Sequence, residues 1–330
     1  MSAHFPDVET IRAGLALATR APSVHNTQPW QWRIGKNSLH LYANPSLQLH
    51  STDPDSRDLM ISCGAALNHC VVAFAALGWR AKLHRFPNRA DSGHLASIEL
   101  TRYPASEVDV ALAVAISHRV TDRRHYSSRP VSVGNIALMG ARAARAGVML
   151  RKVEALTHLS LLVAQAAEQH AASYEYLDEL TRWSGRYASA AGVPAHNSPK
   201  LDPAAAIPRR LFAGAVLDES PGAPPTFDNG VVLALGTKDD DDVARLRAGE
   251  ATSLVLLTAA ASGLASCPIT EPLEIAEIRE QVRSDVFGDS GHPQMLLRIG
   301  WAPVNAEPLP VTPRHPLSDV VTRLDGTSFE

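Results

Sequence analysis

The stretch APSVHNTQPW, residues 21–30, carries several polar side chains that serve no evident packing purpose. A proline at each end, Pro22 being the first, stiffens the run. Ser23, Asn26 and Gln28 supply hydrogen-bond donors and acceptors. Taken alone, the stretch is better explained as an ordinary turn built on Ser and Asn side chains. Its interpretation therefore depends on the other polar segments of the chain.

A second unusual stretch, HRVTDRRHY, occupies residues 118–126 and precedes a predicted helix. Arg119, Arg123 and Arg124 surround the hydroxyl donor Thr121. Three guanidinium groups and a hydroxyl in such a loop can bind a phosphate dianion. Alternatively, the aspartate within the stretch pairs with one arginine and the cluster belongs to the surface. The residues leave these two interpretations equally open.

The third stretch is ASCPITEP, residues 265–272, at the end of an apolar helical pattern. Proline at the entry to a strand leaves backbone N–H groups free to face a ligand. A tight helix-to-strand connection explains the same residues and is the better explanation of this stretch in isolation.

Together the three stretches resemble the nitroreductase family of flavoproteins. The first is similar to the family's A-P-S-x-x-N-x-Q-P-W run, and residues 119–126 are similar to its R-R-T-x-R-R-x-F phosphate motif. Residues 263–269 resemble its G-L-x-x-C-P-I step, and residues 299–302 with Arg314 resemble its closing motif. The similarity covers nearly the whole chain and is closest to the mycobacterial Acg-type NAD(P)H nitroreductases. Val120 departs from the pattern, because arginine or histidine is common there.

The resemblance implies a bound FMN whose flavin ring carries the redox chemistry, so that no side chain need act as acid or base. Arg119, Thr121 and Arg314 would hold the phosphate, and Arg123 would lie near the N1/O2 edge of the ring. The backbone N–H of Thr270 would lie near N5. The full set of cofactor-binding residues implied is Pro22, Ser23, Asn26, Gln28, Arg119, Thr121, Arg123, Pro268, Ile269, Thr270 and Arg314.

Two segments of the chain recur with a fixed shift. Residues 11–21 match residues 136–146 after a shift of 125, and residues 64–78 match residues 249–263 after a shift of 185. Any two alanine-rich helices share identical residues by chance, so each match alone is weak evidence of a repeat. The same order of helix, strand, buried helix and strand in both halves is better evidence. Predicted helices include 8–21, capped by Asp7, and 56–77; predicted strands are 30–34, 39–43, 95–101, 148–153 and 294–301.

The change of shift places an insertion of about 60 residues in the second half. It includes the proline-rich segment 192–230, which is typical of a lid, a surface wrap or disorder. As a lid, the segment would direct Arg209, Arg210 and Phe212 inward.

In the family, the arginine motif precedes the A-P-S run within one subunit, and each flavin lies between two subunits. This chain carries one of each motif, in the reverse order and on opposite halves. The resemblance therefore implies an α+β nitroreductase-like fold that forms an internal pseudo-dimer and acts as a monomer. Residues 1–116 would supply the P-S-x-x-N loop and residues 117–330 the phosphate motif, leaving one complete site.

Composition excludes several classes of protein. With 330 residues, 45% hydrophobic content and a net charge of −3, the chain is typical of a globular protein, and it lacks the basic stripe of a nucleic-acid binder. Three cysteines without a pairing pattern argue against a disulfide framework, and none lies at zinc spacing. Charged residues interrupt any signal-peptide core, and the stretch 253–266 is too short to span a membrane. We expect a soluble cytoplasmic protein.

Two main functions fit these features. In the first, NAD(P)H reduces FMN, which then reduces a small nitroaromatic or quinone acceptor. No G-x-G-x-x-G run occurs, so the nicotinamide would stack directly on the flavin. In the second, the protein is a non-catalytic FMN-binding or flavin-storage protein, because the proline-rich segment closes the site. A third hypothesis, a structural protein with a vestigial site, predicts a colourless protein.

Overall fold

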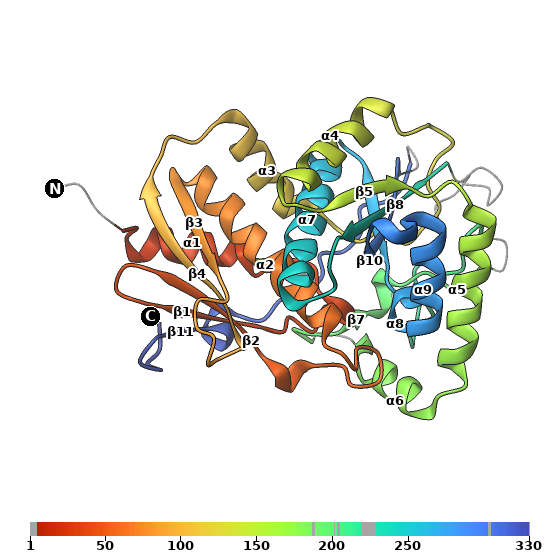
Figure 1. The fold of residues 1–330 in the computed structure, drawn as a ribbon, viewed down its shortest axis with the longest axis horizontal. Coiled ribbons are helices and arrows are strands. Elements are labelled where there is room, and N and C mark those ends of the chain that lie inside the picture. Colours follow the sequence, from red (N-terminus) through yellow and green to blue (C-terminus); the bar gives the residue numbers. More distant parts are fainter. Residues whose placement is uncertain are drawn as a thin grey trace.

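The computed structural model describes residues 5–186, 189–200, 202, 205–219, 229–302 and 305–329. Two sheets lie on either side of a central pair of helices (Figure 1). The first sheet has the order β11-β1-β2-β4-β3, with β1 (Trp30–Ile34), β2 (Leu39–Ala43), β3 (Trp79–Arg85), β4 (His94–Arg102) and β11 (Val321–Arg323). The second has the order β5-β8-β10-β9, with β5 (Met149–Lys152), β8 (Val231–Thr237), β9 (Ala265–Ile269) and β10 (His292–Gly300). A small parallel pair is formed by β6 (Ser184–Arg186) and β7 (Val193–Pro194).

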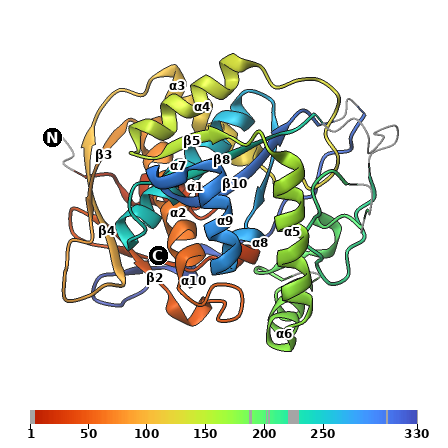
Figure 2. The same ribbon diagram turned by 45° about the vertical axis from the view of Figure 1, so that its right-hand side comes forward.

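Helices surround these sheets. The α-helices are α1 (Val8–Ala18), α2 (Arg57–Ala76), α3 (Glu107–His118), α4 (Val133–Arg145), α5 (Leu156–Ala171), α6 (Tyr174–Arg182), α7 (Asp242–Ala261), α8 (Glu271–Glu274), α9 (Ala276–Val286) and α10 (Leu317–Val320). Short 3-10 helices are η1 (Val24–Asn26), η2 (Pro45–Leu47), η3 (Ala195–Asn197) and η5 (Gly288–Ser290). Helices α5, α8 and α9 lie on the outer side of the second sheet (Figure 2).

The two halves have the same topology, which confirms the predicted fold class. Helices α2 and α7 both contain 20 residues, and both bounds of α7 lie 185 residues after those of α2. Helices α1 and α4 start 125 residues apart. The strand order β1-β2-β4-β3 corresponds to β5-β8-β10-β9, with antiparallel neighbours in both sheets.

Helices α2 and α7 touch at residues that the shift of 185 makes equivalent. A Cβ on Gly64 would lie 2.1 Å from the carbonyl oxygen of Leu246, and a Cβ on Gly249 would lie 2.0 Å from that of Ile61. Leu246 and Ile61 are themselves 185 residues apart. Contacts that repeat in both directions are the mark of a two-fold interface between like surfaces. The two glycines are needed there because the helix backbones touch.

Each sheet is stabilised by apolar side chains that pack against the neighbouring helices. In the second sheet, Leu233 and Leu235 of β8 pack towards α4 and α7, while Val232 and Ala234 face α5 and α9. Both faces are covered, as the uninterrupted apolar run of β8 requires. In the first sheet, Trp30 and Trp32 bury their rings in the core formed with α1 and α2.

At the two ends of the chain, the structure changes two sequence-based assignments and confirms one. Helix α1 ends at Ala18 rather than at residue 21, because Thr19 caps it before the chain turns towards Pro22. The predicted cap Asp7 is confirmed, since its side chain accepts the N–H of Thr10. Strand β11, at the C-terminal end, pairs in parallel with β1, so residues 321–323 join the first sheet although they were assigned to the second half.

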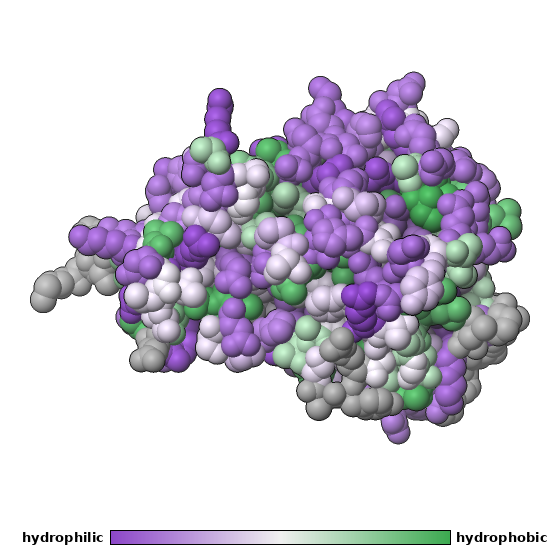
Figure 3. All heavy atoms as spheres, turned by 90° about the horizontal axis from the view of Figure 1, so that it is seen from below, coloured by the Kyte–Doolittle hydropathy of each residue, from purple (hydrophilic) through white to green (hydrophobic). Residues whose placement is uncertain are grey.

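Helix α2 is long and apolar enough to cross a membrane, but 78% of its most apolar window is buried inside the protein. Burial of this kind is typical of the core helix of a globular protein. Hydrophilic residues spread over much of the face seen in Figure 3, with small hydrophobic areas between them.

Candidate functional site

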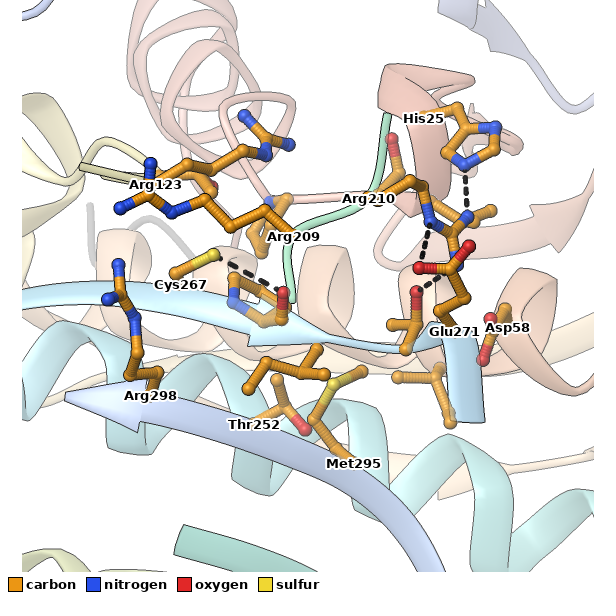
Figure 4. Close-up of a pocket in the computed structure, with 18 of the residues that line it drawn as sticks. His25, Asp58, Arg123, Arg209, Arg210, Thr252, Cys267, Glu271, Met295 and Arg298 are labelled. Atoms are coloured by element: carbon orange, nitrogen blue, oxygen red, sulfur yellow. Dashed lines mark hydrogen bonds and ion pairs between the residues drawn. The ribbon is translucent and has the colours of Figure 1, made fainter. Parts of the chain in front are cut away.

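One cavity lies where the three unusual stretches of the sequence meet (Figure 4). Its walls come from the loop before η1, from α2 and α7, from the segment after α3, from β9, and from residues 207–212. It brings together these predicted cofactor-binding residues: Pro22, Ser23, Thr121, Arg123, Pro268, Ile269 and Thr270. The remaining predicted residues, Asn26, Gln28, Arg119 and Arg314, lie outside its lining.

The loop that contains η1 is held in a strained conformation. His25, Asn26 and Gln28 have φ angles of 44°, 56° and 55°, a left-handed region that non-glycine residues rarely adopt. The Ser23 hydroxyl accepts the backbone N–H of Gln28, and Ser62 on α2 accepts that of Val24. Such strain persists only where surrounding contacts impose it, and it concentrates at binding sites.

Asn26 and Gln28 tie this loop to distant parts of the chain. The Asn26 amide donates to the carbonyl oxygens of Gly192 and Pro313, at 3.1 and 3.2 Å. The Gln28 amide donates to the carbonyl of Ala190 and accepts the N–H of His315. The sequence did not predict these contacts. Through them, both side chains hold the loop that contains η1 against the segments around residues 190–192 and 313–315.

Three arginines lie close together, of which Arg119 is buried and Arg20 and Arg314 are partly buried. Arg20 immediately precedes the loop, Arg119 lies two residues before Thr121, and Arg314 donates to the carbonyl oxygens of Arg20 and Ala21 at 3.1 Å. Burial is the main cause that lowers the pKa of Arg119 and Arg314, and the charges of the neighbouring arginines lower it further.

No carboxylate pairs with any of these three side chains among the residues that the structure describes. Buried nitrogen atoms without a hydrogen-bond partner remain on each of them, including Nε and Nη1 of Arg119. Positive charge that is withdrawn from water without a counter-charge costs free energy, and an anion bound to this cluster would offset that cost. Sequence reasoning missed Arg20, although its position directly before the A-P-S run was a usable signal.

The arginine stretch meets strand β9 through the backbone. Thr121 forms a parallel bridge with Ser266, whose carbonyl accepts the N–H of Asp122 at 3.0 Å. This pairing brings Thr121 and Arg123 to the cavity. Asp122 pairs with Arg124 at 2.9 Å, as the second interpretation expects, but both side chains are buried and do not lie on the surface. No ion pair joins Asp122 to Arg119 or Arg123 among the described residues.

Arg123 is partly buried in the cavity wall. It donates to the carbonyl of Asn197 at 3.1 Å, and its guanidinium lies 4.8 Å from the centre of the Phe212 ring. Burial is the main cause that lowers the pKa of Arg123. Strand β9 pairs with β10 along one side, and on its other side Ser266 is bridged to Thr121. Beyond this bridge, Cys267, Pro268 and Ile269 line the cavity.

Residues 207–212 cover the cavity. Arg210 contacts His25 Nε2 at 2.5 Å (Figure 4). It also donates to the Glu274 carboxylate at 2.5 Å and to Thr270 Oγ1 at 3.3 Å. Phe212 packs edge-to-face on His25 with ring centres 5.7 Å apart. Burial, and then the charge of Arg210, lower the pKa of His25 well below its usual value, so this imidazole is neutral.

A pair of buried carboxyl groups lies at the start of α2, where Asp58 lines the cavity. Asp53 accepts the backbone N–H groups of Asp58 and Leu59, and Asp58 pairs with Arg57 at 2.6 Å. Burial is the main cause that raises the pKa of Asp53 to about 7 and that of Asp58 to about 6. Because both pKa values are raised, these carboxyl groups keep their protons to a higher pH in the folded protein than in the unfolded chain. The free energy of unfolding that they contribute is therefore complete below pH ~4 and declines as the pH rises towards 7.

An Asp53→Asn variant should therefore gain stability relative to the parent as the pH rises. Between pH 5 and 8, its free energy of unfolding should improve on the parent's by roughly 1–3 kcal/mol, because the neutral amide needs no charge in the core. Urea unfolding at several pH values measures this difference. The matched control Asp289→Asn, at an exposed position, should differ from the parent in free energy of unfolding by the same amount at every pH. If the difference between Asp53→Asn and the parent is also independent of pH, the raised pKa of Asp53 is contradicted.

Proteins of similar sequence show which family the chain belongs to. The Mycobacterium tuberculosis H37Rv protein named "Putative NAD(P)H nitroreductase Rv3131" is 61% identical over 321 residues, covering 97% of this chain and 93% of its own length. The chain belongs to the nitroreductase family. The same organism's "Putative NAD(P)H nitroreductase acg" is 34% identical to this nitroreductase, with 94% and 95% of the two chains covered. No protein-family model matches the chain.

Two solved structures resemble this nitroreductase more distantly. A protein from Anabaena variabilis described as a "putative nitroreductase" aligns over 91% of this chain and 90% of its own, with 11% identity and a TM-score of 0.45. The FMN-dependent nitroreductase NfnB from Mycobacterium smegmatis, in complex with NADPH, aligns over 66% of this chain and 99% of its own, with 15% identity and a TM-score of 0.40.

Proposed function

We propose that this nitroreductase binds one FMN per chain and uses it to pass electrons from NAD(P)H to a small nitroaromatic or quinone acceptor. The observation that carries the proposal is the cluster of Arg20, Arg119 and Arg314. On each of these side chains a buried nitrogen atom lacks a hydrogen-bond partner among the described residues. A phosphate dianion offers the acceptors these groups need. When bound, FMN supplies the electron transfer, and the protein supplies its position and electrostatic environment.

The cavity residues suit a flavin ring next to that phosphate. Pro268 and Ile269 offer an apolar wall on the edge strand β9, and Arg123 offers a positive charge that favours an anionic ring. Ser23 and Pro22 approach from the other half of the chain. In this proposal, residues 1–116 with β11 form one half and the rest of 117–330 forms the other.

The mirrored position in the pseudo-dimer is filled. Ala65 lines the cavity, and its equivalent 185 residues later is Glu250, which is buried and bonded to Arg85 by two contacts of 2.7 Å. Thr252 also lines the cavity, whereas its equivalent is the buried core residue Leu67. An ion pair and a leucine thus replace the open space of the first site.

Purified protein should accordingly contain about one FMN per chain, because the mirrored position is filled by side chains of the described residues. Flavin released by denaturation can be quantified against protein concentration. A ratio near two would show that the mirrored position also binds and would contradict the single-site architecture.

The oxidoreductase function is tested by mixing the yellow holoprotein with NADPH or NADH under anaerobic conditions in a stopped-flow instrument. Loss of flavin absorbance, followed by its return on addition of a nitroaromatic or quinone, is the expected result. A colourless protein that binds no FMN would contradict the proposal. We place the protein in the cytoplasm as a monomer that binds neither nucleic acid nor membranes.

A flavin-storage function is the alternative, and the cover of the cavity favours it. Arg210 joins residues 207–212 to His25, Thr270 and Glu274 by side-chain contacts. A cover held in this way would act as a lid that excludes water and also a bulky hydride donor. The predicted lid segment 192–230 extends beyond this cover, and its residues 201, 203, 204 and 220–228 lie outside the described residues.

Replacing Arg210 with alanine should open this lid. Loss of one partner from a buried ion pair costs about 3–5 kcal/mol. Closing the cover without Arg210 would leave the buried Glu274 carboxylate with only His170, at 3.9 Å, among the described residues. Reduction of the flavin by NADPH should then be at least about tenfold faster than in the parent, and residues 205–219 should exchange amide hydrogens faster. Lys200→Ala, which removes an exposed ion pair on the same segment, is the control; equal rates in Arg210→Ala would show that the cover does not limit access.

A further inference from the structure

His69 lies on α2 with none of its surface exposed. Its Nδ1 lies 2.8 Å from Ser253 Oγ and 3.1 Å from the carbonyl oxygen of Ala65. Its Nε2 is buried without a hydrogen-bond partner among the described residues. A half-satisfied imidazole in a core is costly, which points to a missing partner at Nε2.

The contacts determine which nitrogen carries the proton. The carbonyl of Ala65 can only accept, and the Ser253 hydroxyl donates to Asn68 Oδ1 at 2.7 Å, which leaves its oxygen to accept as well. Nδ1 is therefore the protonated nitrogen of the neutral ring. Nε2 presents a lone pair, which can accept a proton.

The charges facing His69 all have one sign. They are Arg119 from the end of α3, Arg314 from the C-terminal segment and Arg20 from the end of α1, while α7 contributes the hydroxyl of Ser253. Burial, and then these arginines, lower the pKa of His69 well below its usual value. The ring is neutral as long as no anion is present.

We propose that binding of the cofactor phosphate to this arginine cluster is coupled to uptake of one proton, held between His69 Nε2 and a phosphate oxygen. This inference rests on the proposed FMN site. The phosphate dianion offsets the three positive charges and is itself an acceptor, so two lone pairs would face each other unless a proton lies between them. The reaction takes one proton from solvent, and no electron moves.

The coupling makes cofactor affinity depend on pH with a defined sign. The complex holds one more proton than the separated protein and FMN dianion, so affinity rises as the pH falls. Equilibrium dialysis of the full-length holoprotein between pH 7 and 8.5 should give an FMN dissociation constant that increases about tenfold per pH unit. Riboflavin, which lacks the phosphate, should bind with no such slope.

The variant His69→Asn identifies the group that holds the proton. Its amide can still donate where Nδ1 does, but it cannot be protonated. Its FMN affinity should lose the slope while the exposed control His50→Asn keeps it. A parent protein that binds FMN without a pH slope, or a slope unchanged in His69→Asn, would overturn the coupling alone; a parent that binds riboflavin and FMN equally would overturn the phosphate site and the coupling with it.

Discussion

Arg119→Ala should lose FMN during purification or dilution, with affinity reduced roughly tenfold to a hundredfold. A hydrogen bond to a charged group contributes about 1.5–3 kcal/mol, and each 1.4 kcal/mol is a factor of about ten in affinity. Arg119 is buried, and two of its nitrogen atoms have no protein partner, so its removal deletes contacts to the anion without breaking an ion pair within the protein.

Flavin fluorescence during serial dilution of the holoprotein gives the dissociation constant directly. Arg89→Ala removes an exposed arginine and should leave retention unchanged. Riboflavin affinity should be nearly the same in Arg119→Ala and in the parent, because the residues proposed to contact the ring, such as Pro268 and Ile269, are left unchanged. FMN retention equal to the parent's would show that Arg119 does not bind the phosphate.

Gly249→Ala should destabilise the fold by about 3 kcal/mol or more, a large part of the 5–15 kcal/mol that a domain of ordinary stability possesses. The added Cβ would lie 2.0 Å from the carbonyl oxygen of Ile61 and 2.8 Å from Cα of Gly64. Both atoms belong to the backbone of α2, so only separation of the two central helices relieves the overlap. That separation would open the packing between the halves.

Gly134→Ala is the matched control. Gly134 also lies in a helix, α4, but its nearest neighbour is Ser132 Oγ at 3.9 Å from the new Cβ, so alanine should be neutral or stabilise by about 0.4–1 kcal/mol. Urea unfolding followed by circular dichroism compares the two variants. Equal stability for Gly249→Ala and the parent would mean that the helices do not meet as closely as described.

Local patterns in the sequence were sufficient to predict most of the helices and strands that the sequence analysis named. Strands β1 and β2 have the predicted bounds, because their short apolar runs are separated by a turn sequence and need no distant partner to be recognised. The cap Asp7 of α1 was likewise predicted, since capping is decided within four residues. The two shifts of 125 and 185 recovered the repeat of helices because equivalent helices pack in equivalent surroundings.

The sequence by itself thus determined the family, the repeated order of elements and the cavity walls at Ser23, Thr121 and Pro268. Tertiary structure alone decided which charges meet. Arg314 reaches the carbonyl of Arg20 across 294 positions of the chain, and β11 joins β1 from the far end. His69 meets the arginines only because α1, α3 and the C-terminal segment converge on α2. The physical reason is that electrostatic interaction depends on distance and burial in space, neither of which any local spacing of residues encodes.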